Sequence, residues 1–245
     1  MLDLVFPPFC PVCRQRLGDG RRDPLCKGCW EAFDRIVAPF CVLCGVPFGG
    51  SRPHRSPAEI GAALASSRRC GACQRRPPPF HYARSAVRYD DVAREAVHAL
   101  KFRGRRPLAA PLGDLLTEIA LPEIPSGGPD LVIPVPLHRR RERDRGFNQA
   151  LLLARRLGEA WRVPVCADVL ARTVATPPQT ELTATARRAN VSGAFALRRP
   201  DLVVGRHVVL VDDVFTTGST VGACVRRLRE GGATTVGVLT VARAI

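Results

Sequence analysis

Two adjacent carboxylates, Asp212 and Asp213, are followed closely by a loop rich in hydroxyl groups. Small hydroxyl side chains around a glycine let backbone N–H groups and hydroxyls surround an anion, an arrangement typical of phosphate binding. Carboxylates would repel a phosphate, so the two aspartates are better suited to accept hydrogen bonds from sugar hydroxyls. These types and spacings predict a site for a ribose 5-phosphate. The residues predicted to surround the phosphate are Thr216, Thr217, Gly218, Ser219 and Thr220.

The residues on either side of this loop predict a strand before it and a helix after it. The run 208–211 is continuously apolar, as in a parallel strand buried on both faces, and Val221, Cys224, Val225 and Leu228 recur at helical spacing. In an open α/β sheet, ligands lie beyond the carboxyl ends of the strands, where a helix N-terminus offers unpaired N–H donors. The alternative interpretation is an ordinary strand-loop-helix turn with solvated acids and capping threonines.

Basic residues at a second helix end are candidates to contact the anionic portion of such a ligand. A predicted helix through Ala93, Val97 and Leu100 ends in a stretch that contains Lys101 and Arg103. In one interpretation Lys101 and Arg103 reach the ligand. In the other they are solvated cations, which are favoured at a helix C-terminus.

A run of five arginines and two acids, residues 139–145, precedes a predicted helix whose apolar face extends from Phe147 to Trp161. Guanidinium groups bind phosphate oxygens in pairs, so the run can bind a pyrophosphate or a nucleic-acid backbone. A charged, solvated loop is the alternative. The position of Arg145 beside the helix start favours it as the phosphate ligand.

Eight of the ten cysteines form four pairs in the N-terminal region of the chain, each pair with two residues between its members. Such pairs are typical of zinc knuckles in a reducing compartment, and four thiolates satisfy one tetrahedral Zn²⁺. We expect two closed, structural Zn²⁺ sites. The sequential grouping is favoured over an interleaved one, which the sequence leaves open. The first predicted site is Cys10, Cys13, Cys26 and Cys29, and the second is Cys41, Cys44, Cys70 and Cys73.

The chain of 245 residues carries 37 Lys and Arg against 22 Asp and Glu, a formal net charge of +15. This excess favours phosphate-rich partners, although a solvated arginine-rich surface is an equally good interpretation. The N-terminus lacks the pattern of a signal peptide, and no apolar stretch is long enough for a membrane span. We therefore expect a cytoplasmic protein.

Composition divides the chain near residue 80. The Pro/Gly-rich, cysteine-rich region, residues 1–80, ends in an extended proline linker, 75–79, and a predicted α/β domain occupies 81–245. A further stretch, 49–69, is predicted to be a loop inserted in the second zinc site. In the α/β domain the pattern predicts strands over 83–89, 130–136, 163–170 and 234–242 and a second helix over 108–119.

The segment 207–220 resembles the phosphoribosyl-pyrophosphate (PRPP) binding signature of type I phosphoribosyltransferases. The cysteine pairs and proline linker, followed in order by LKFRGR, VPVPLH, RGFNQA, TPPQT and VDDVFTTGST, resemble the competence protein F (ComF) family, including its GntX-like members. The resemblance implies a double zinc ribbon fused to a type I phosphoribosyltransferase fold, a twisted and mainly parallel sheet flanked by helices. It also implies, in some members, a role in DNA uptake during natural transformation.

The same resemblance implies roles for individual residues. Asp212 and Asp213 would hold the ribose and act in catalysis, with Mg²⁺ bound to PRPP. A loop formed by Val135, Pro136, Leu137 and His138 would face the pyrophosphate. A flexible loop that closes over the substrate would contribute Gln179, Arg187, Arg188 and Asn190.

The sequence thus predicts a protein that binds PRPP or a ribonucleotide and transfers or senses phosphoribosyl groups. No residue stands out as a base that would activate an acceptor, so the acceptor is undefined. The competing interpretation is an adaptor without catalysis, which binds PRPP or a nucleotide as a signal or binds single-stranded DNA through its arginines. DNA-uptake proteins are further candidate partners.

Overall fold

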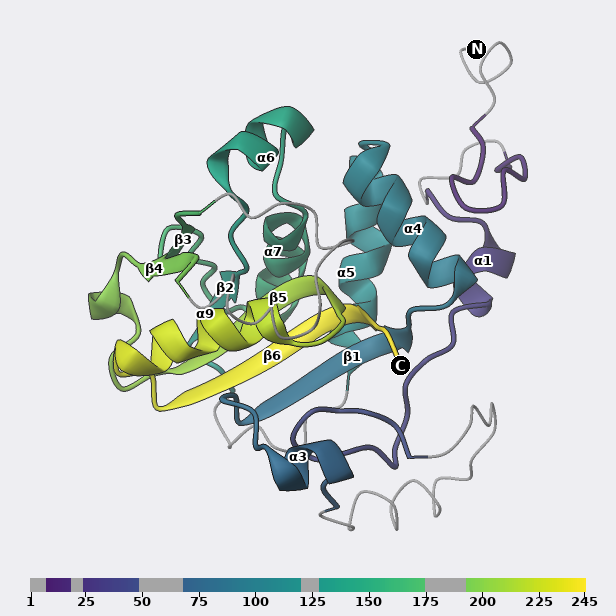
Figure 1. The fold of residues 1–245 in the computed structure, drawn as a ribbon. Helices are drawn as coiled ribbons and strands as arrows, with labels where there is room; N and C mark the ends of the chain where they lie inside the picture. The colour runs from purple at the N-terminus through teal and green to yellow at the C-terminus, as the bar shows by residue number, and fades with distance from the viewer. Residues whose placement is uncertain (1–7, 19–23, 49–67, 120–127, 175–192) are drawn as a thin grey trace.

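A computed structural model describes residues 8–18, 24–48, 68–119, 128–174 and 193–245 (Figure 1). A four-stranded parallel sheet with the order β1-β6-β5-β2 lies at its centre. A second sheet is a short antiparallel pair, β3 and β4. The strands are β1 (Tyr82–Arg88), β2 (Leu131–Pro134), β3 (Leu170–Arg172), β4 (Phe195–Leu197), β5 (His207–Phe215) and β6 (Thr235–Arg243).

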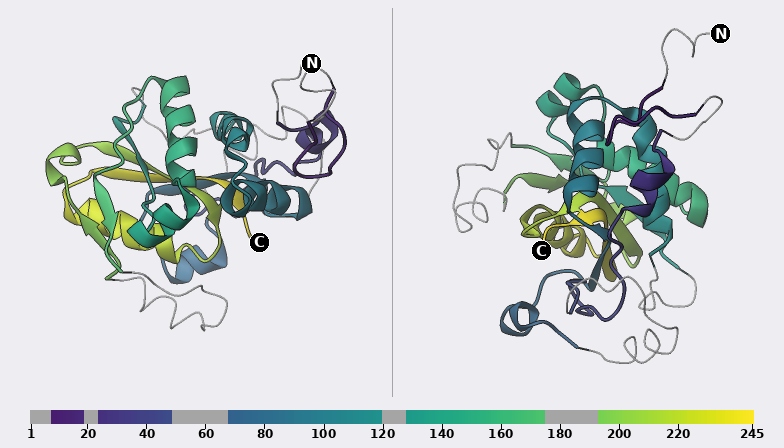
Figure 2. Two further views of the ribbon diagram at one scale, coloured as in Figure 1. Left: turned by 90° about the horizontal axis from the view of Figure 1, so that it is seen from above. Right: turned by 90° about the vertical axis from the view of Figure 1, so that its right-hand side faces the viewer.

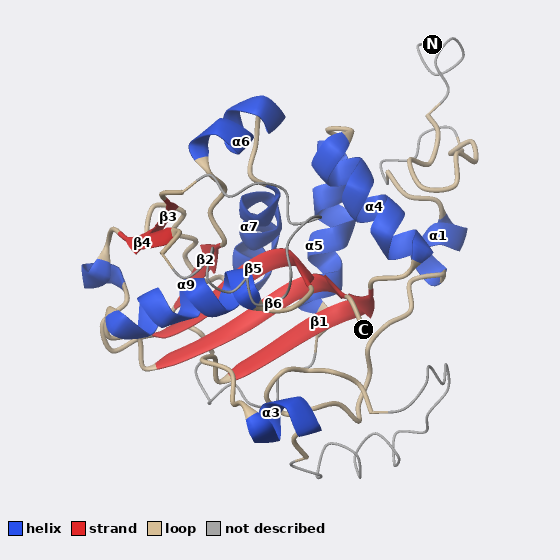
Figure 3. Ribbon diagram, in the orientation of Figure 1, coloured by secondary structure: helices blue, strands red, loops and turns tan. Residues whose placement is uncertain are grey.

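Helices cover both faces of the central sheet (Figure 3). On one face, Val209 and Val211 of β5 pack in a core cluster with α4 (Asp91–Phe102), α5 (Ala109–Thr117) and α7 (Gln149–Trp161). On the other face, Val208 and Leu210 pack with α9 (Ser219–Glu230). Successive side chains of a strand point to opposite faces, so the apolar run of β5 is buried on both, as its sequence predicts.

The type I phosphoribosyltransferase-like architecture predicted from the sequence is confirmed, but β5 is longer than its apolar run. It continues through the acidic pair to Phe215, because Asp212 and Val214 remain paired with β6. The last strand and the helices after residues 90 and 218 are also confirmed. The helix predicted over 108–119 begins as a 3-10 turn, η2 (Arg106–Leu108), and continues as α5.

Two local predictions are wrong. Residues 139–145, taken as a possible loop, form a short helix, α6 (Arg139–Arg145), because arginine and glutamate are good helix formers and the His138 side chain caps the first turn. Of the strand predicted over 163–170, the structure retains a bridge between Val165 and Val132 and the first residue of β3, Leu170, since Pro164 lacks an N–H for a ladder. A 3-10 turn, η4 (Pro200–Leu202), follows β4.

The N-terminal region contains two copies of the same ribbon. In both copies the first cysteine donates its N–H across a tight turn, from Cys10 to Gln15 O and from Cys41 to Val46 O, at 2.8 Å each. In both, the third cysteine precedes a five-residue helix, α1 (Lys27–Glu31) or α3 (Gly71–Arg75). The first ribbon therefore provides a matched reference for the second.

The two ribbons contact opposite faces of the sheet. The first ribbon belongs to the core cluster of α4, α5 and α7, and the second to the cluster of α9. Between them the chain crosses the edge of the sheet, where Arg35 forms an antiparallel bridge with Val87 and Ile36 N–H donates to Ala86 O at 2.8 Å. The views in Figure 2 show α1 beside α4 and α3 well apart from it. This crossing also covers the edge strand β1.

The proline linker, 75–79, does not stand free of the α/β domain. Arg229 of α9 donates from Nη1 to Pro79 O at 3.1 Å, and Phe80 is buried in the α9 cluster. The division at residue 80 stays a prediction.

No helix in the described ranges is long and apolar enough to cross a membrane.

We predict that Gly45→Ala lowers the free energy of unfolding by roughly 2–4 kcal/mol. Gly45 has φ +72°, and a Cβ at this position would lie 2.3 Å from Ala83 O of β1. The measurement is urea unfolding. The control is Arg14→Ala at the equivalent position of the first ribbon, which already carries a side chain at φ 62° and is exposed. Equal stability of Gly45→Ala and wild type would contradict the prediction.

Candidate functional site

The cysteines gather into two tetrads, each with all four Sγ atoms within 4.8 Å of one another. Sulfur atoms lie 3.8 Å apart between Cys10 and Cys29, 3.5 Å between Cys13 and Cys26, and 3.7 Å between Cys44 and Cys70. Zn–S bonds of about 2.3 Å in a tetrahedron place the sulfurs about 3.8 Å apart, so the geometry fits Zn²⁺. The sequential grouping is confirmed, and the interleaved alternative is wrong.

Backbone N–H groups favour thiolate in both tetrads. Burial would raise the pKa of Cys10, but N–H groups of Cys26 and Cys13 outweigh it and lower the pKa to about 7. The pKa of Cys41 is lowered to about 7 in the same way, by N–H groups of Cys44 and Cys70. One thiol of each tetrad is thus favoured as the thiolate that binds metal, whereas burial and the neighbouring cysteines raise the pKa of Cys29 and Cys73, which would lose their protons as the ion binds. Four sulfur ligands leave no open position, as expected of structural zinc.

A cavity of about 730 Å³ lies beyond the carboxyl ends of β2 and β5, where a parallel sheet is expected to bind its ligand. It brings together residues from the end of α4, the loop after β2, α6, the start of α7, β3, β5 and the start of α9. The sequence-predicted residues that line it are Lys101, Val135, Pro136, Leu137, Arg145, Asp212, Asp213, Thr216 and Thr220.

The remaining predicted residues lie elsewhere. His138 is not among the lining residues, and its Nδ1 accepts from Arg140 N–H at 3.2 Å at the start of α6. Thr217, Gly218 and Ser219 line a neighbouring cavity of about 850 Å³, which shares Thr216 with the first. The hydroxyl-rich loop therefore separates two cavities. Gln179, Arg187, Arg188 and Asn190, predicted to close over the substrate, lie outside the described residues.

The two aspartates occupy different environments. The Asp213 side chain is only 4% exposed, and its Oδ2 lies 2.6 Å from Lys101 Nζ. Lys101, considered from the sequence as a ligand for an anion, lines the cavity and pairs with this buried carboxylate. Burial would lower the pKa of Lys101, but Asp213 and Asp212 outweigh it and raise that pKa. The pair removes one negative charge from the cavity.

Asp212 is half-buried, and its Oδ1 accepts from Asp213 N–H at 2.9 Å. Burial and the neighbouring charge of Asp213 raise the pKa of Asp212 to about 7, although Lys101 opposes the shift. A carboxyl group that titrates near neutrality can either accept or donate a hydrogen bond to a sugar hydroxyl.

The loop after β5 has free donors. Gly218, at φ +73°, is the N-cap of α9, and Thr217 Oγ1 lies 2.8 Å from Ser219 Oγ. Among the described residues, the N–H groups of Thr217 and Gly218 have no acceptor, whereas Ser219 N–H donates to Thr217 Oγ1 at 3.4 Å. The free N–H groups of Thr217 and Gly218, together with the N-terminus of α9, can therefore bind an anion.

The loop after β2 has fewer free donors than the resemblance implies. Val135 N–H donates to Val211 O at 2.9 Å, and Asn148 Nδ2 donates to Val135 O at 3.1 Å, so both backbone groups of Val135 are used. Pro136 has no N–H. The register of the sheet therefore leaves Leu137, which lines the cavity, as the amide of this loop available to a ligand.

Several lining residues escaped the sequence analysis. Phe102, 69% exposed, lies beneath the Arg145 guanidinium at 5.5 Å from the ring centroid. Arg172 of β3 reaches the same cavity from a stretch of the chain that carries no motif, and its position follows from a bridge to His138. Such long-range placement leaves no signal in a single sequence. The other unpredicted lining residues include Gly104, Asp144, Gln149 and Val214, whereas Arg141 belongs to the arginine run predicted to bind phosphate.

Comparisons with known proteins find matches for both the cysteine-rich N-terminal region and the α/β region that carries the acidic pair. A family model described as double zinc ribbon domain matches residues 1–74, and one described as phosphoribosyl transferase domain matches residues 143–245. Among solved structures, one described as the allosteric regulatory enzyme of purine biosynthesis is 26% identical, covers 53% of this chain and 24% of its own, and has a TM-score of 0.36.

Curated relatives match over nearly the whole length. The DNA utilization protein YhgH of Escherichia coli O157:H7 is 36% identical over 99% of this chain and 100% of its own. Competence protein F of Haemophilus influenzae is 29% identical over 96% of each chain. Competence protein ComFC of Bacillus subtilis is 26% identical over 86% of this chain and 80% of its own.

We predict two zinc ions per chain. Cys10→Ser and Cys41→Ser should each leave one, because a tetrad that loses one thiolate binds Zn²⁺ far more weakly. Atomic emission spectroscopy of the purified proteins measures the ratio. Cys224→Ser, at a buried cysteine of α9 outside both tetrads, is the control and should retain two. A wild-type protein with one zinc would contradict the prediction.

The raised pKa of Asp212 predicts a fall in stability as the pH rises. Between about pH 4 and pH 7 the folded state holds a proton that an unfolded aspartate releases, so the free energy of unfolding decreases through this window. Asp212→Asn should remove this decrease, on the order of 2 kcal/mol, and be more stable than wild type above pH 7. Urea unfolding from pH 4 to 8 measures it, with the exposed Asp168→Asn as control. Parallel wild-type and Asp212→Asn profiles would refute the assignment.

Proposed function

This chain, which matches family models of a double zinc ribbon and a phosphoribosyl transferase domain, belongs to the family of the DNA utilization protein YhgH and competence protein F, and from this premise we propose that it binds PRPP. The observation that carries the proposal is the lining of one cavity by the Asp212–Asp213 pair together with Thr216 and Thr220 of the hydroxyl-rich loop. A ligand there meets groups suited to a sugar and groups suited to a phosphate.

Each portion of PRPP has a counterpart in the cavity. The ribose hydroxyls would bond to Asp212 and Asp213. The 5-phosphate would lie at the loop 216–220, whose Thr216 and Thr220 line this cavity and whose free N–H groups belong to Thr217 and Gly218, which line the neighbouring one. The pyrophosphate would lie toward Arg145 and the amide of Leu137. Mg²⁺ would arrive with PRPP and offset the charge of the leaving group.

The Lys101–Asp213 pair explains how two acids can lie beside a phosphorylated ligand. With Asp213 neutralised and the pKa of Asp212 near 7, the net charge that a phosphate meets is small. When the C1–O bond to pyrophosphate breaks, positive charge develops on the ribose, and the two carboxylates can stabilise it. Binding is therefore compatible with transfer of the phosphoribosyl group to an acceptor.

A second candidate function is nucleic-acid binding through α6. None of the seven residues of α6 is buried, and five of them are arginines. Two of these, Arg141 and Arg145, line the cavity, while the other three arginines are exposed. In this alternative the protein is an adaptor in DNA use or uptake, as the names of its relatives indicate, and PRPP or a ribonucleotide is a signal.

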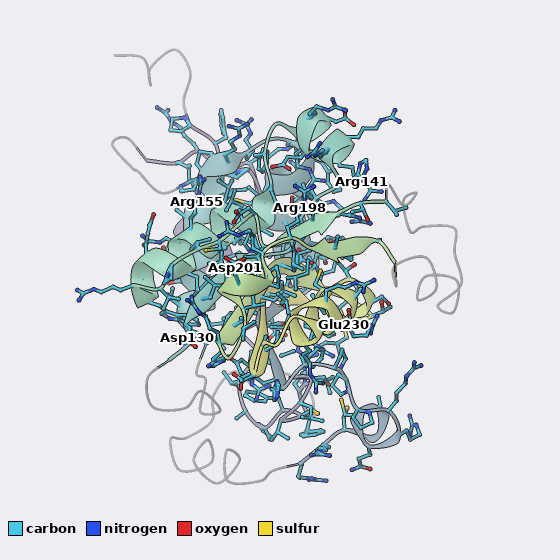
Figure 4. All side chains as sticks on the ribbon, turned by 90° about the vertical axis from the view of Figure 1, so that its left-hand side faces the viewer. Asp130, Arg141, Arg155, Arg198, Asp201 and Glu230 are labelled. Carbon is cyan, nitrogen blue, oxygen red and sulfur yellow. The ribbon has the colours of Figure 1, made fainter. Side chains whose placement is uncertain are left out.

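Calorimetry with Mg²⁺ and PRPP tests the proposal. Wild type is expected to bind one PRPP, and Asp212→Asn and Asp213→Asn are each expected to weaken binding at least tenfold, because hydrogen bonds to charged groups contribute about 1.5–3 kcal/mol. The control is Asp201→Asn, at an exposed carboxylate of η4 (Figure 4) that pairs with Arg199 at 2.9 Å. Equal affinity in all four proteins would reject the site.

The same proteins separate the two candidate functions. If a base or nucleoside is added to wild type in the presence of PRPP and Mg²⁺, release of pyrophosphate would establish transfer, provided that Asp213→Asn releases none. Single-stranded DNA binding that falls steeply with salt and is unchanged in Asp212→Asn would favour the adaptor.

A further inference from the structure

Two buried arginines join the second ribbon to the central sheet. Arg84 of β1 is 2% exposed and donates from Nη2 to Val42 O at 3.1 Å, whereas Arg243 of β6 is 8% exposed and donates from Nη1 to Cys44 O at 2.6 Å. A buried guanidinium is costly unless it is paired. Four thiolates around one Zn²⁺ carry two excess negative charges, so the two arginines are suited to balance the second tetrad.

The two arginines differ in what lies beneath them. Arg84 covers Phe40 of the ribbon itself, with its guanidinium carbon 4.6 Å from the ring centroid. Arg243 covers Phe215, the last residue of β5, at 4.4 Å. Phe215 is 5% exposed and also meets Phe80 edge to face at 6.0 Å. Arg243 therefore connects the ribbon to the end of the strand that carries the acidic pair.

Phe215 in turn supports the hydroxyl-rich loop. Its Cζ atom lies 2.8 Å from the point where a Cβ on Gly218 would stand, so the left-handed turn at Gly218 rests directly on the ring. Free donors of the proposed phosphate site, the N–H groups of Thr217 and Gly218, belong to this turn. A displacement of the ring would move them.

The second ribbon also forms one wall of the cavity that Thr217, Gly218 and Ser219 line. Cys44, Cys73 and the linker 76–79 face the loop across this space of about 850 Å³. The first ribbon makes no comparable contact in the described residues. It packs with α4 and α5 on the opposite face, and Phe215 belongs to the other core cluster.

We propose that Arg243 is a positioning residue through which the second zinc ribbon holds the loop of the sugar-phosphate site in place. The ribbon, ordered by its metal, presents Cys44 O to Arg243. Arg243 fixes the ring of Phe215, and the ring fixes the turn at Gly218. Loss of metal from the second ribbon therefore loosens the loop, and loss from the first does not. This proposal rests on the proposed function only for the identity of the ligand.

The first test compares Arg243→Gln with Arg84→Gln. Both variants remove a buried guanidinium that bonds a ribbon carbonyl and stacks on a ring, but only Arg243 touches Phe215. Hydrogen exchange of the amides of residues 216–222 and the affinity for PRPP with Mg²⁺ are measured. Arg243→Gln is expected to speed this exchange and to weaken PRPP binding, each at least fivefold. Arg84→Gln is expected to change each of them less than twofold. Equal effects of the two variants, or no effect of Arg243→Gln, would overturn the proposal.

Arg243→Lys provides a rescue. Lysine retains a donor for Cys44 O but lacks the planar group that covers Phe215, so partial recovery of the loop protection is expected. If Arg243→Lys still holds two zinc ions and its amides at residues 216–222 exchange as fast as those of Arg243→Gln, the proposed chain of contacts is contradicted.

The duplication of the ribbon supplies a second test that does not depend on the arginine variants folding. Cys41→Ser and Cys10→Ser remove equivalent ligands from the two copies. Cys41→Ser is expected to speed exchange at residues 216–222 at least fivefold and to weaken PRPP binding, and Cys10→Ser to leave that segment within twofold of wild type. The proposal is rejected if the two cysteine variants exchange alike there.

The two readouts separate this proposal from the proposed function. If wild type binds no PRPP but the exchange results follow the pattern above, the function fails and the contact chain stands. If wild type binds PRPP and all variants bind it equally well, the contact chain fails and the function stands.

Discussion

The site depends on the parallel pairing of β5 with a strand on each side. Val208 to Val211 are buried on both faces and bond to β2 and β6, so the strand has little freedom to shift. Parallel strands end at a common edge, and this brings the acidic pair, the loop after β2 and the start of α9 to one place. The same pairing uses the N–H of Val135, which shows that the sheet both builds the cavity and limits which donors it offers.

Charge balance is the second constraint on this edge. Two adjacent carboxylates in a partly buried place would repel each other and a phosphate. Lys101 relieves this by pairing with Asp213, and the raised pKa of Asp212 relieves it further. Near the second tetrad, Arg84 and Arg243 donate to ribbon carbonyls, where their charges are placed to offset those of zinc-bound thiolates. In both places a buried cation allows anionic groups to be held where the structure needs them.

The two ribbons are copies, yet the fold gives them different surroundings. Because the chain crosses the edge of the sheet at Arg35 and Ile36, the first ribbon packs against α4 and α5 and the second against β1, β6 and α9. Gly45 illustrates the difference, since the second copy approaches Ala83 O too closely for a side chain while the first has arginine at the same place. Only the second copy lies within reach of the hydroxyl-rich loop through described contacts.

The sequence by itself determined the features that depend on local chemistry. The spacing of the cysteines predicted both zinc sites, and the apolar run, acidic pair and loop 216–220 predicted strand, site and helix, because side-chain period and ligand count are read from neighbouring residues. Tertiary structure alone decided that Lys101 pairs with Asp213, that Arg172 enters the cavity and that Arg243 joins Cys44 to Phe215. These contacts link residues far apart in the chain, and only the packing of the sheet and its helices brings them together.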